Sequence, residues 1–231
     1  MTIKGMIFDI DGTLVDTNAA HVEAWRRAFA EMGYHIPVER ITPEIGKGGD
    51  QLVPSVLGEE IEKREGEALR RLQKEQFLTT AATQRFGVFP GAKEIFLALR
   101  TRGIRAALAT SSDDKQLDAT LTSAGVDLRR LADVVVTKTD GETSKPAPDL
   151  VVGAVEKLGL LATDCAMVGD TIYDAQACRR AGVVFVGVLS GGTPEPTLRE
   201  AGAREVWKDM GYLLADLDRA IAIASLHPAA R

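Results

Sequence analysis

The sequence predicts a layered α/β fold with a parallel sheet, interrupted after its first strand by a helical insert. Short apolar runs without polar alternation recur along the chain, and stretches with helical periodicity separate them. Such runs are typical of strands covered on both faces, and their alternation with helices is typical of layered α/β proteins. The rhythm stops between residues 18 and 86, where we find no convincing strand. This interruption predicts the insert.

The predicted strands are short and widely spaced. In chain order they cover residues 3–8, 104–109, 133–137, 165–169 and 183–188, with a weaker candidate at 204–207. Helices are expected between them, at residues 90–103, 114–124, 148–158, 172–181 and 209–224. The first of these helices has Pro90 near its start and Gly103 at its end, and both residue types are common at helix boundaries.

The insert contains the helical stretch AAHVEAWRRAFAEMG, the bend IGKGGD and the charged stretch EEIEKREGEALRRLQKEQF. Opposite charges recur four residues apart in the charged stretch, which predicts ion pairs on a solvated helix face. The predicted pairs are Glu59–Lys63, Glu60–Arg64 and Glu67–Arg71. The apolar face predicted for this helix consists of Ile61, Ala68, Leu69 and Leu72. We therefore predict an α/β core made of residues 1–16 and 87–231, and a helical part made of residues 17–86.

The composition argues against several functional classes. The net charge of −5 disfavours general binding to nucleic acid, whose phosphate backbone requires a basic surface. No apolar run approaches the ~20 residues of a membrane span, and the apolar stretch in MTIKGMIFD is too short for a signal peptide. The cysteines, Cys165 and Cys178, have no metal-binding spacing and indicate reduced, buried thiols. A cytoplasmic protein without a nucleic-acid or membrane partner is expected.

Two acids directly follow the first predicted strand, in the stretch FDIDGTLVDT. Alternation along an extended chain places Asp9 and Asp11 on one side, and Gly12 allows a tight turn. Ligands of open α/β sheets bind beyond the carboxyl ends of the strands. Two close carboxylates repel each other unless a cation intervenes, and a hard divalent ion such as Mg²⁺ suits their oxygens. A turn with helix-capping acids is the alternative interpretation.

Three further segments carry polar residues beside predicted strands or turns. These residues are Thr110, Ser111 and Ser112 in LATSSDD, Lys145 in SKPAPD, and Asp170 and Asp174 in MVGDTIYD. Hydroxyls and free amides at a helix start can hold a phosphate. Each segment also has an ordinary explanation, because Ser, Thr and Asp are common helix caps and most lysines are solvent-exposed.

Taken together and in this order, the four segments resemble the motifs of the haloacid dehalogenase-like (HAD) hydrolase superfamily. DIDGTLVDT is similar to the first motif, Thr110 to the second, Lys145 to the third and GDTIYD to the fourth. The overall pattern is most similar to the phosphoglycolate phosphatase-like members that carry a helical cap. The resemblance implies a Rossmann-like three-layer core with a helical cap domain inserted after the first strand. It also implies hydrolysis of a small phosphate monoester, either phosphoglycolate or a sugar phosphate.

The resemblance further implies an aspartyl-phosphate intermediate. Asp9 would be the nucleophile that attacks phosphorus. Asp11 would protonate the leaving alcohol and then activate the water that hydrolyses the intermediate. Thr110 and the backbone amide of Ser111 would hold the phosphoryl oxygens, with help from Ser112.

Two kinds of positive charge complete the site that the resemblance implies. Lys145 would neutralise the nucleophile and the transferring phosphoryl group. Mg²⁺ would bind the side chain of Asp9, the backbone carbonyl of Asp11 and the side chain of Asp170. Asp174 would orient this cluster through water or through Lys145.

Two other reactions of the superfamily are disfavoured by Asp11. Dehalogenase relatives lack this second acid, because a departing halide needs no proton. Phosphonate-cleaving relatives also replace it and use a lysine of the cap to form a Schiff base. Lys47 lies in the insert, but the presence of Asp11 argues against that route.

A sugar-phosphate mutase of the β-phosphoglucomutase type is the main alternative, because such sequences share SKPAPD. Three features favour hydrolysis. Thr13 follows the first-motif glycine as in the phosphatases, the acidic pair Asp113–Asp114 stands where hexose mutases carry a lysine, and the fourth motif has Gly169 where mutases tend to have Glu. An alternative of a different class is a catalytically silent phosphate-binding protein, although every catalytic position is filled.

The insert supplies candidate contacts to the substrate. The bend EIGKGGD, residues 44–50, is the candidate specificity loop, and Lys47 offers a cation for a substrate acid or second phosphate. His21 on the first insert helix lies near the predicted hinge, where it could contact substrate or simply pack. Trp25 and Phe29 follow at steps of four residues and are predicted to form the apolar interior of the insert.

Overall fold

A parallel sheet forms the centre of the computed structural model, which describes residues 2–140 and 143–226. Within these residues the sheet has six strands, in the order β5 (Val134–Val136), β4 (Arg105–Ala109), β1 (Gly5–Phe8), β6 (Cys165–Gly169), β7 (Val184–Val188) and β8 (Val206–Trp207). The predicted α/β class with a parallel sheet is confirmed. The weak candidate at 204–207 shortens to the two residues of β8.

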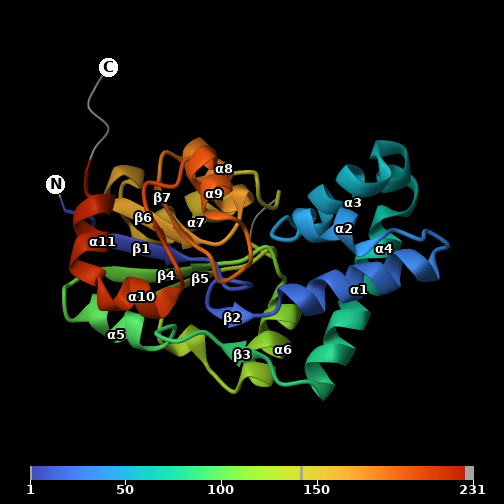
Figure 1. The fold of residues 1–231 in the computed structure, drawn as a ribbon, viewed down its shortest axis with the longest axis horizontal. Helices are drawn as coiled ribbons and strands as arrows, with labels where there is room; N and C mark the ends of the chain where they lie inside the picture. Colours follow the sequence, from blue (N-terminus) through green and yellow to red (C-terminus); the bar gives the residue numbers. More distant parts are fainter. Residues whose placement is uncertain (1, 141–142, 227–231) are drawn as a thin grey trace.

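Helices cover both faces of the sheet (Figure 1). One face packs against α7 (Asp149–Leu158), α8 (Ile172–Ala181) and α9 (Glu195–Ala201). The other packs against α5 (Glu94–Arg100), α6 (Asp114–Ala124), α10 (Met210–Ala215) and α11 (Leu217–Ala224). Alternation along β1 explains the two layers, because Met6 and Phe8 join one apolar cluster and Ile7 joins the other.

Two helix predictions need correction on the C-terminal side of the sheet. The single helix predicted at 209–224 is two helices, because Asp216 leaves helical geometry with φ −114° and ψ 27°. Helix α9 was not predicted, although Pro194 and Pro196 at its start are ordinary features of a helix N-terminus.

The insert forms a separate group of helices at one end of the sheet (Figure 1). It contains α1 (Asn18–Glu31), α2 (Val38–Ile41), the 3₁₀ turn Thr42–Glu44, α3 (Gly49–Leu57) and α4 (Glu59–Thr83). The chain enters and leaves it through an antiparallel pair, β2 (Val15–Asp16) and β3 (Gly87–Val88). Trp25 and Phe29 pack with Leu52 and Leu69 in an apolar cluster of the insert, as predicted. The boundaries of core and cap, at 16/17 and 86/87, stay a prediction.

The charged helix α4 forms, the ion pairs predicted for it are wrong, and its apolar face is predicted only in part: Leu69 is buried and Ile61 packs against the same cluster. None of the three predicted pairs is present among the described residues, and the ion pairs observed are Glu60–Lys63, Glu62–Arg70, Glu65–Arg64 and Glu75–Arg71. Exposed charges gain little from any particular partner, so spacing alone does not select one. The buried face consists of Gly66, Leu69, Gln73, Phe77 and Ala81. No helix in the described part of the chain is long and apolar enough to cross a membrane.

Candidate active site

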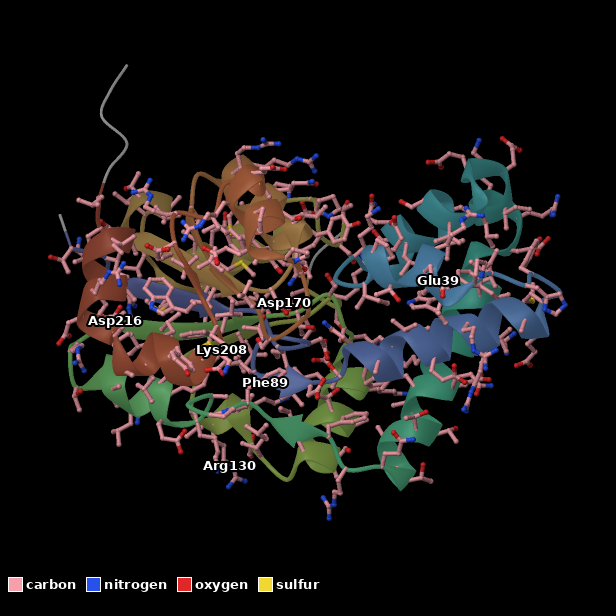
Figure 2. The ribbon with its side chains drawn as sticks, viewed as in Figure 1. Glu39, Phe89, Arg130, Asp170, Lys208 and Asp216 are labelled. Carbon is pink, nitrogen blue, oxygen red and sulfur yellow. The ribbon has the colours of Figure 1, made fainter. Side chains whose placement is uncertain are left out.

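The carboxyl ends of β1, β4 and β6 meet at the edge of the sheet that faces the insert. Phe8 at the end of β1 is in register with Leu108 of β4 and Val168 of β6. The chain positions that follow these strands therefore become neighbours, although they are far apart in the sequence. Figure 2 shows Asp170 at this edge, whereas Asp216 lies at the opposite end of the sheet.

The turn after β1 brings the first-motif acids against the end of β6. Gly12 has a φ of +82°, and a Cβ at this position would lie 2.4 Å from a carboxylate oxygen of Asp170. A side chain here would collide with Asp170 and would also be strained by the backbone conformation. Glycine thus permits the close approach of the turn to Asp170.

Lys145 is buried at the centre of a cluster of acids, with 1% of its surface exposed. Its ammonium donates hydrogen bonds to the Asp9 carboxylate and, at 2.7 Å, to Oδ1 of Asp174. Burial alone would lower the pKa of Lys145, but the carboxylates of Asp174 and Asp9 outweigh it and raise the pKa above its ordinary value. The alternative of a solvent-exposed lysine is therefore wrong.

Asp174 performs two tasks at the start of α8. Its carboxylate accepts hydrogen bonds from the backbone N–H of Thr171 at 3.1 Å and from the Thr171 hydroxyl at 2.6 Å, which completes a capping box. Its other oxygen accepts the bond from Lys145. The N-cap itself is Thr171, so the expectation of an acid at the N-cap is wrong; Asp174 is the N3 member of the capping box and also belongs to the charged cluster.

Asp170 is held by two residues of the segment that follows β1. The hydroxyl of Thr13 donates to Oδ1 at 2.9 Å, and the side-chain amide of Asn18 donates to Oδ2 at 3.2 Å. Burial and the neighbouring carboxylate of Asp174 raise the pKa of Asp170 to about 7, against the opposite effect of these hydrogen bonds and Lys145. A carboxylate in this position is stabilised by an added positive charge.

The three acids of the cluster form a donor set that fits a divalent cation. Asp9, Asp170 and Asp174 are buried, and each offers one carboxylate oxygen within 4.8 Å of the other two. Burial raises the pKa of Asp9 well above its ordinary value, despite the ammonium of Lys145. Hard oxygen donors with excess negative charge are what Mg²⁺ prefers in proteins. The sequence analysis named the side chains of Asp9 and Asp170 as ligands of the ion. In the structure Asp174 is also close enough to bind it.

Asp11 faces a different set of partners. Its carboxylate accepts hydrogen bonds from Thr17 Oγ1 at 2.7 Å, Ser112 Oγ at 3.1 Å and Thr110 Oγ1 at 3.2 Å, and it lies 3.3 Å from Nε2 of His21. Burial raises the pKa of Asp11, but His21 and the hydroxyl groups outweigh burial and lower it below its ordinary value. Two neighbouring carboxyl groups thus have pKa values shifted in opposite directions.

His21 links this acid to the insert. Its ring stacks on Phe77 of α4 with 4.1 Å between centroids, and its Nδ1 lies 3.4 Å from the amide nitrogen of Gln73. The Gln73 carbonyl in turn accepts a hydrogen bond from the Gln116 amide of α6 at 3.2 Å. His21 therefore packs and contacts the site at the same time.

A cavity of about 60 Å³ lies between the sheet edge and the insert. Asp9, Asp11 and Lys145 line one side, and the candidate phosphate-binding residues Thr110, Ser111 and Ser112 line the adjoining wall. The hydroxyl oxygen of Ser111 is buried and has no hydrogen-bond partner among the described residues. A buried hydroxyl without a partner is costly, so it is available to a ligand.

Lys47 of the insert also lines this cavity, but its ammonium has other partners. The ammonium contacts the Glu44 carboxylate, donates to Ser55 Oγ at 2.7 Å and lies 4.8 Å from the centroid of the Tyr173 ring. The cavity therefore brings together Asp9, Asp11, Lys145, His21 and the hydroxyl residues 110–112. Asp170 and Asp174 lie behind it in the acid cluster and do not line it, and the charge of Lys47 is directed elsewhere.

Several residues of the site were missed in the sequence analysis. These are Thr17 and Asn18 after β1, and Gln73 and Gln116 on α4 and α6, while Thr13 was selected as a phosphatase feature but not as a partner of Asp170. Thr17 and Asn18 had a signal, because a hydroxyl and an amide side chain stand next to each other a few residues after the paired acids. The two glutamines had none, since their place depends on how α4 packs against α6.

Comparisons with known proteins agree with this geometry. Residues 3–182 match a family model described as haloacid dehalogenase-like hydrolase. The chain is 32% identical over 192 residues to a phosphoglycolate phosphatase from Nitrosospira multiformis, which covers 79% of the chain and 81% of that relative. It is 28% identical over 213 residues to Protein SUPPRESSOR OF QUENCHING 1, chloroplastic, from Arabidopsis thaliana, covering 91% of the chain; the chain spans about a fifth of that relative's length. The crystal structure of a hydrolase from Pseudomonas syringae matches with a TM-score of 0.86 and 31% identity, over 94% of the chain and 98% of that structure.

Proposed function

The chain belongs to the haloacid dehalogenase-like hydrolase family, and we propose that it is a cytoplasmic, Mg²⁺-dependent phosphatase that hydrolyses a small phosphate monoester through an aspartyl-phosphate. The observation that supports this proposal is the buried contact between the carboxylate of Asp9 and the ammonium of Lys145 at the wall of the cavity. The relative from Nitrosospira multiformis, which is named a phosphatase, supports the same reaction class.

Asp9 attacks phosphorus, and the local charge makes this attack possible. A phosphate dianion and a bare carboxylate repel each other by about 4 kcal/mol at ~4 Å and an effective dielectric of ~20. Lys145 offsets this repulsion because its ammonium touches the attacking carboxylate and remains charged. Thr110 and the backbone amide of Ser111 bind phosphoryl oxygens, and both residues line the cavity.

Asp11 carries the proton in both steps. Its lowered pKa favours the carboxylate, which is the form that activates water for hydrolysis of the aspartyl-phosphate. In the first step the negative phosphate beside Asp11 raises its pKa by like-charge repulsion, so that it can protonate the leaving oxygen. The hydroxyl of Thr17, 2.7 Å away, holds the carboxylate in place.

Asp9, Asp170 and Asp174 are the side chains that would hold Mg²⁺, with the backbone carbonyl of Asp11 as a further oxygen donor. When bound, the ion supplies positive charge that offsets the negative charge of the phosphoryl group. Thr13 and Asn18 fix the orientation of Asp170, because each donates a hydrogen bond to one of its two oxygens.

Release of phosphate and formation of a phosphoenzyme test the proposal. With Mg²⁺ present, the protein should hydrolyse p-nitrophenyl phosphate, and the Asp11→Asn variant should accumulate an acid-stable phosphoryl group on Asp9 that mass spectrometry can locate. Conversion of a hexose 1-phosphate to its 6-phosphate isomer without release of phosphate would instead show a mutase. Binding of phosphate without turnover of any monoester would show the silent binding protein.

A further inference from the structure

The polar side chains of the cavity indicate which kind of phosphate monoester it accepts. We infer that the leaving group is a neutral, hydroxyl-bearing molecule, such as a polyol or a sugar, and that a leaving group with its own carboxylate is discriminated against. This inference rests on the proposed phosphatase function and selects one of the two substrate classes that the sequence analysis left open.

The cavity lacks an uncommitted cation for a second acid. Among the described residues that line it, the lysines are Lys145 and Lys47, and arginine is absent. The ammonium of Lys145 is bound to Asp9 and Asp174 and serves the phosphoryl group. The imidazole of His21 faces the carboxylate of Asp11. The ammonium of Lys145 and the imidazole of His21 therefore each already face a carboxylate.

The side chain of Lys47 lines the cavity, but its ammonium contacts residues outside the cavity. Its three ammonium contacts, to Glu44, Ser55 and the ring of Tyr173, are with residues that do not line the cavity. Glu44 neutralises the ammonium directly. A substrate carboxylate would have to displace Glu44 and compete with an ion pair that is already formed.

The N-terminus of α3 is a further source of positive potential near the cavity, and it is also compensated. Gly48 and Gly49 line the cavity and begin this helix. Asp50 lies in the first turn, where a carboxylate offsets the helix dipole. Burial raises the pKa of Asp50, but hydrogen bonds from Ser144 and the charge of Lys138 lower it below its ordinary value, so the side chain stays anionic.

The groups that remain available are neutral and suit hydroxyls. Gln73 is 6% exposed and Gln116 binds it through one of the two N–H groups of its own amide. The oxygen and second N–H of that amide can therefore accept from and donate to one hydroxyl. The unpartnered hydroxyl of Ser111 lies on the same cavity and can bind another oxygen. Gln73, Ser111 and Gln116 also line an adjoining pocket whose cations are each paired with an acid: Arg70 with Glu62, Arg71 with Glu75, Lys74 with Asp113 and Lys138 with Asp50. This wall therefore suits alcohols and offers a carboxylate no unpaired positive charge among these residues.

Two pairs of substrates test the inference, because the members of each pair differ only in CH₂OH against COO⁻. The first pair is 2-hydroxyethyl phosphate and 2-phosphoglycolate, and the second is erythritol 4-phosphate and 4-phosphoerythronate. We expect kcat/KM to be at least about tenfold higher for the alcohol of each pair. The acid loses the favourable hydrogen bond that the hydroxyl of the alcohol makes with the cavity wall. Equal or higher kcat/KM for the acids would overturn the inference, as would turnover of p-nitrophenyl phosphate with neither alcohol hydrolysed. Failure to hydrolyse any monoester would instead overturn the proposed phosphatase function.

Two variants test the structural reason. Glu44→Gln should raise kcat/KM for 2-phosphoglycolate several-fold, because Lys47 loses its anionic partner and can turn to the substrate. Gln116→Leu should lower kcat/KM for the alcohols about tenfold by removing the amide. Gln76→Leu is the matched control, since Gln76 lies on α4 near Gln73 but does not line the cavity. A ratio of alcohol to acid that stays at the wild-type value in both test variants would overturn the inference.

Discussion

The charged cluster at the sheet edge and the contact surface of the insert are built in different ways. Asp9, Lys145, Asp170 and Asp174 are each at most 5% exposed; Lys145 joins Asp9 to Asp174 through hydrogen bonds, and Thr13 and Asn18 hold Asp170. The insert meets the α/β part through both buried and solvated contacts: Ala24, Phe77 and Ala81 pack in the apolar cluster on the sheet, whereas the side chains of the ion pair between Lys74 and Asp113 are 30% and 29% exposed. The charged cluster is thus wholly buried, whereas part of the contact surface of the insert is open to water.

The insert has an apolar interior of its own. Trp25, Phe29, Leu52 and Leu69 belong to a cluster that is distinct from the two clusters packed on the sheet. The bend before α3 approaches the core closely, since a Cβ at Gly46 would lie 2.6 Å from Thr171. Opening the insert would therefore cost polar contacts and also the burial of Ala24, Phe77 and Ala81, which belong to the cluster on the sheet, while the interior around Leu69 would stay intact.

The largest effect is expected from Asp9→Asn. The variant keeps the shape of the side chain and loses the nucleophile, so kcat should fall at least about 10³-fold, as for a single catalytic group. Phosphate release measures the effect, and circular dichroism checks the fold. Asp164→Asn is the matched control, because Asp164 is similarly buried at 6% exposed but pairs with Lys4 away from the cavity. Retained turnover in Asp9→Asn would show that another group attacks phosphorus.

A smaller loss is expected from Asp170→Asn. Removal of one of three carboxylates should raise the Mg²⁺ concentration for half-maximal activity by about 10–100-fold. Mg²⁺ should also raise the melting temperature of the wild type more than that of the variant, because only binding to the folded state stabilises it. EDTA should abolish wild-type activity and Mg²⁺ should restore it. Activity that survives EDTA would remove the metal from the proposal.

The sheet edge could be predicted from the sequence for a geometric reason. Asp9, Thr110 and Asp170 each follow an apolar run that can only be a buried strand, and parallel strands end at a common edge. Lys145 follows no strand, and its place in the cluster came from the family resemblance alone. Its burial among acids could not be inferred from local sequence, because most lysines are exposed.

The insert was predicted as helical, but its contacts were not. Helical periodicity identifies a buried face, yet Gln73 and Phe77 were not assigned to it because the charged composition of α4 hides the apolar positions. The stacking of His21 on Phe77 joins two helices that are separated by the whole insert in sequence. Such a contact depends on the angle and position at which two helices cross. The spacing of residues in one sequence does not determine that crossing geometry.

Leu69→Ala tests whether the apolar interior of the insert is independent of the chemistry. Leu69 is fully buried, so the variant should lose about 2–5 kcal/mol of unfolding free energy through lost burial and the cavity that remains. Urea titration measures the loss. At low temperature, where the variant is folded, kcat for p-nitrophenyl phosphate should change far less than in Asp170→Asn. A parallel collapse of kcat would show that this interior and the sheet edge act as one unit.

The smallest effect is expected at the contact between the two regions. Lys74 of α4 pairs with Asp113, which also caps α6 by accepting from the Gln116 backbone N–H at 3.0 Å. A double-mutant cycle of Lys74→Met and Asp113→Asn isolates the pair from the loss of the cap. Because both side chains are partly exposed, the coupling should be about 0.2–1 kcal/mol and should decline as salt is added. KM should change by no more than about fivefold, which is 1 kcal/mol expressed as a ratio. A coupling of several kcal/mol that salt does not weaken would show that this contact behaves like a buried ion pair, and the contrast between a buried edge and a partly solvated contact surface would then be wrong.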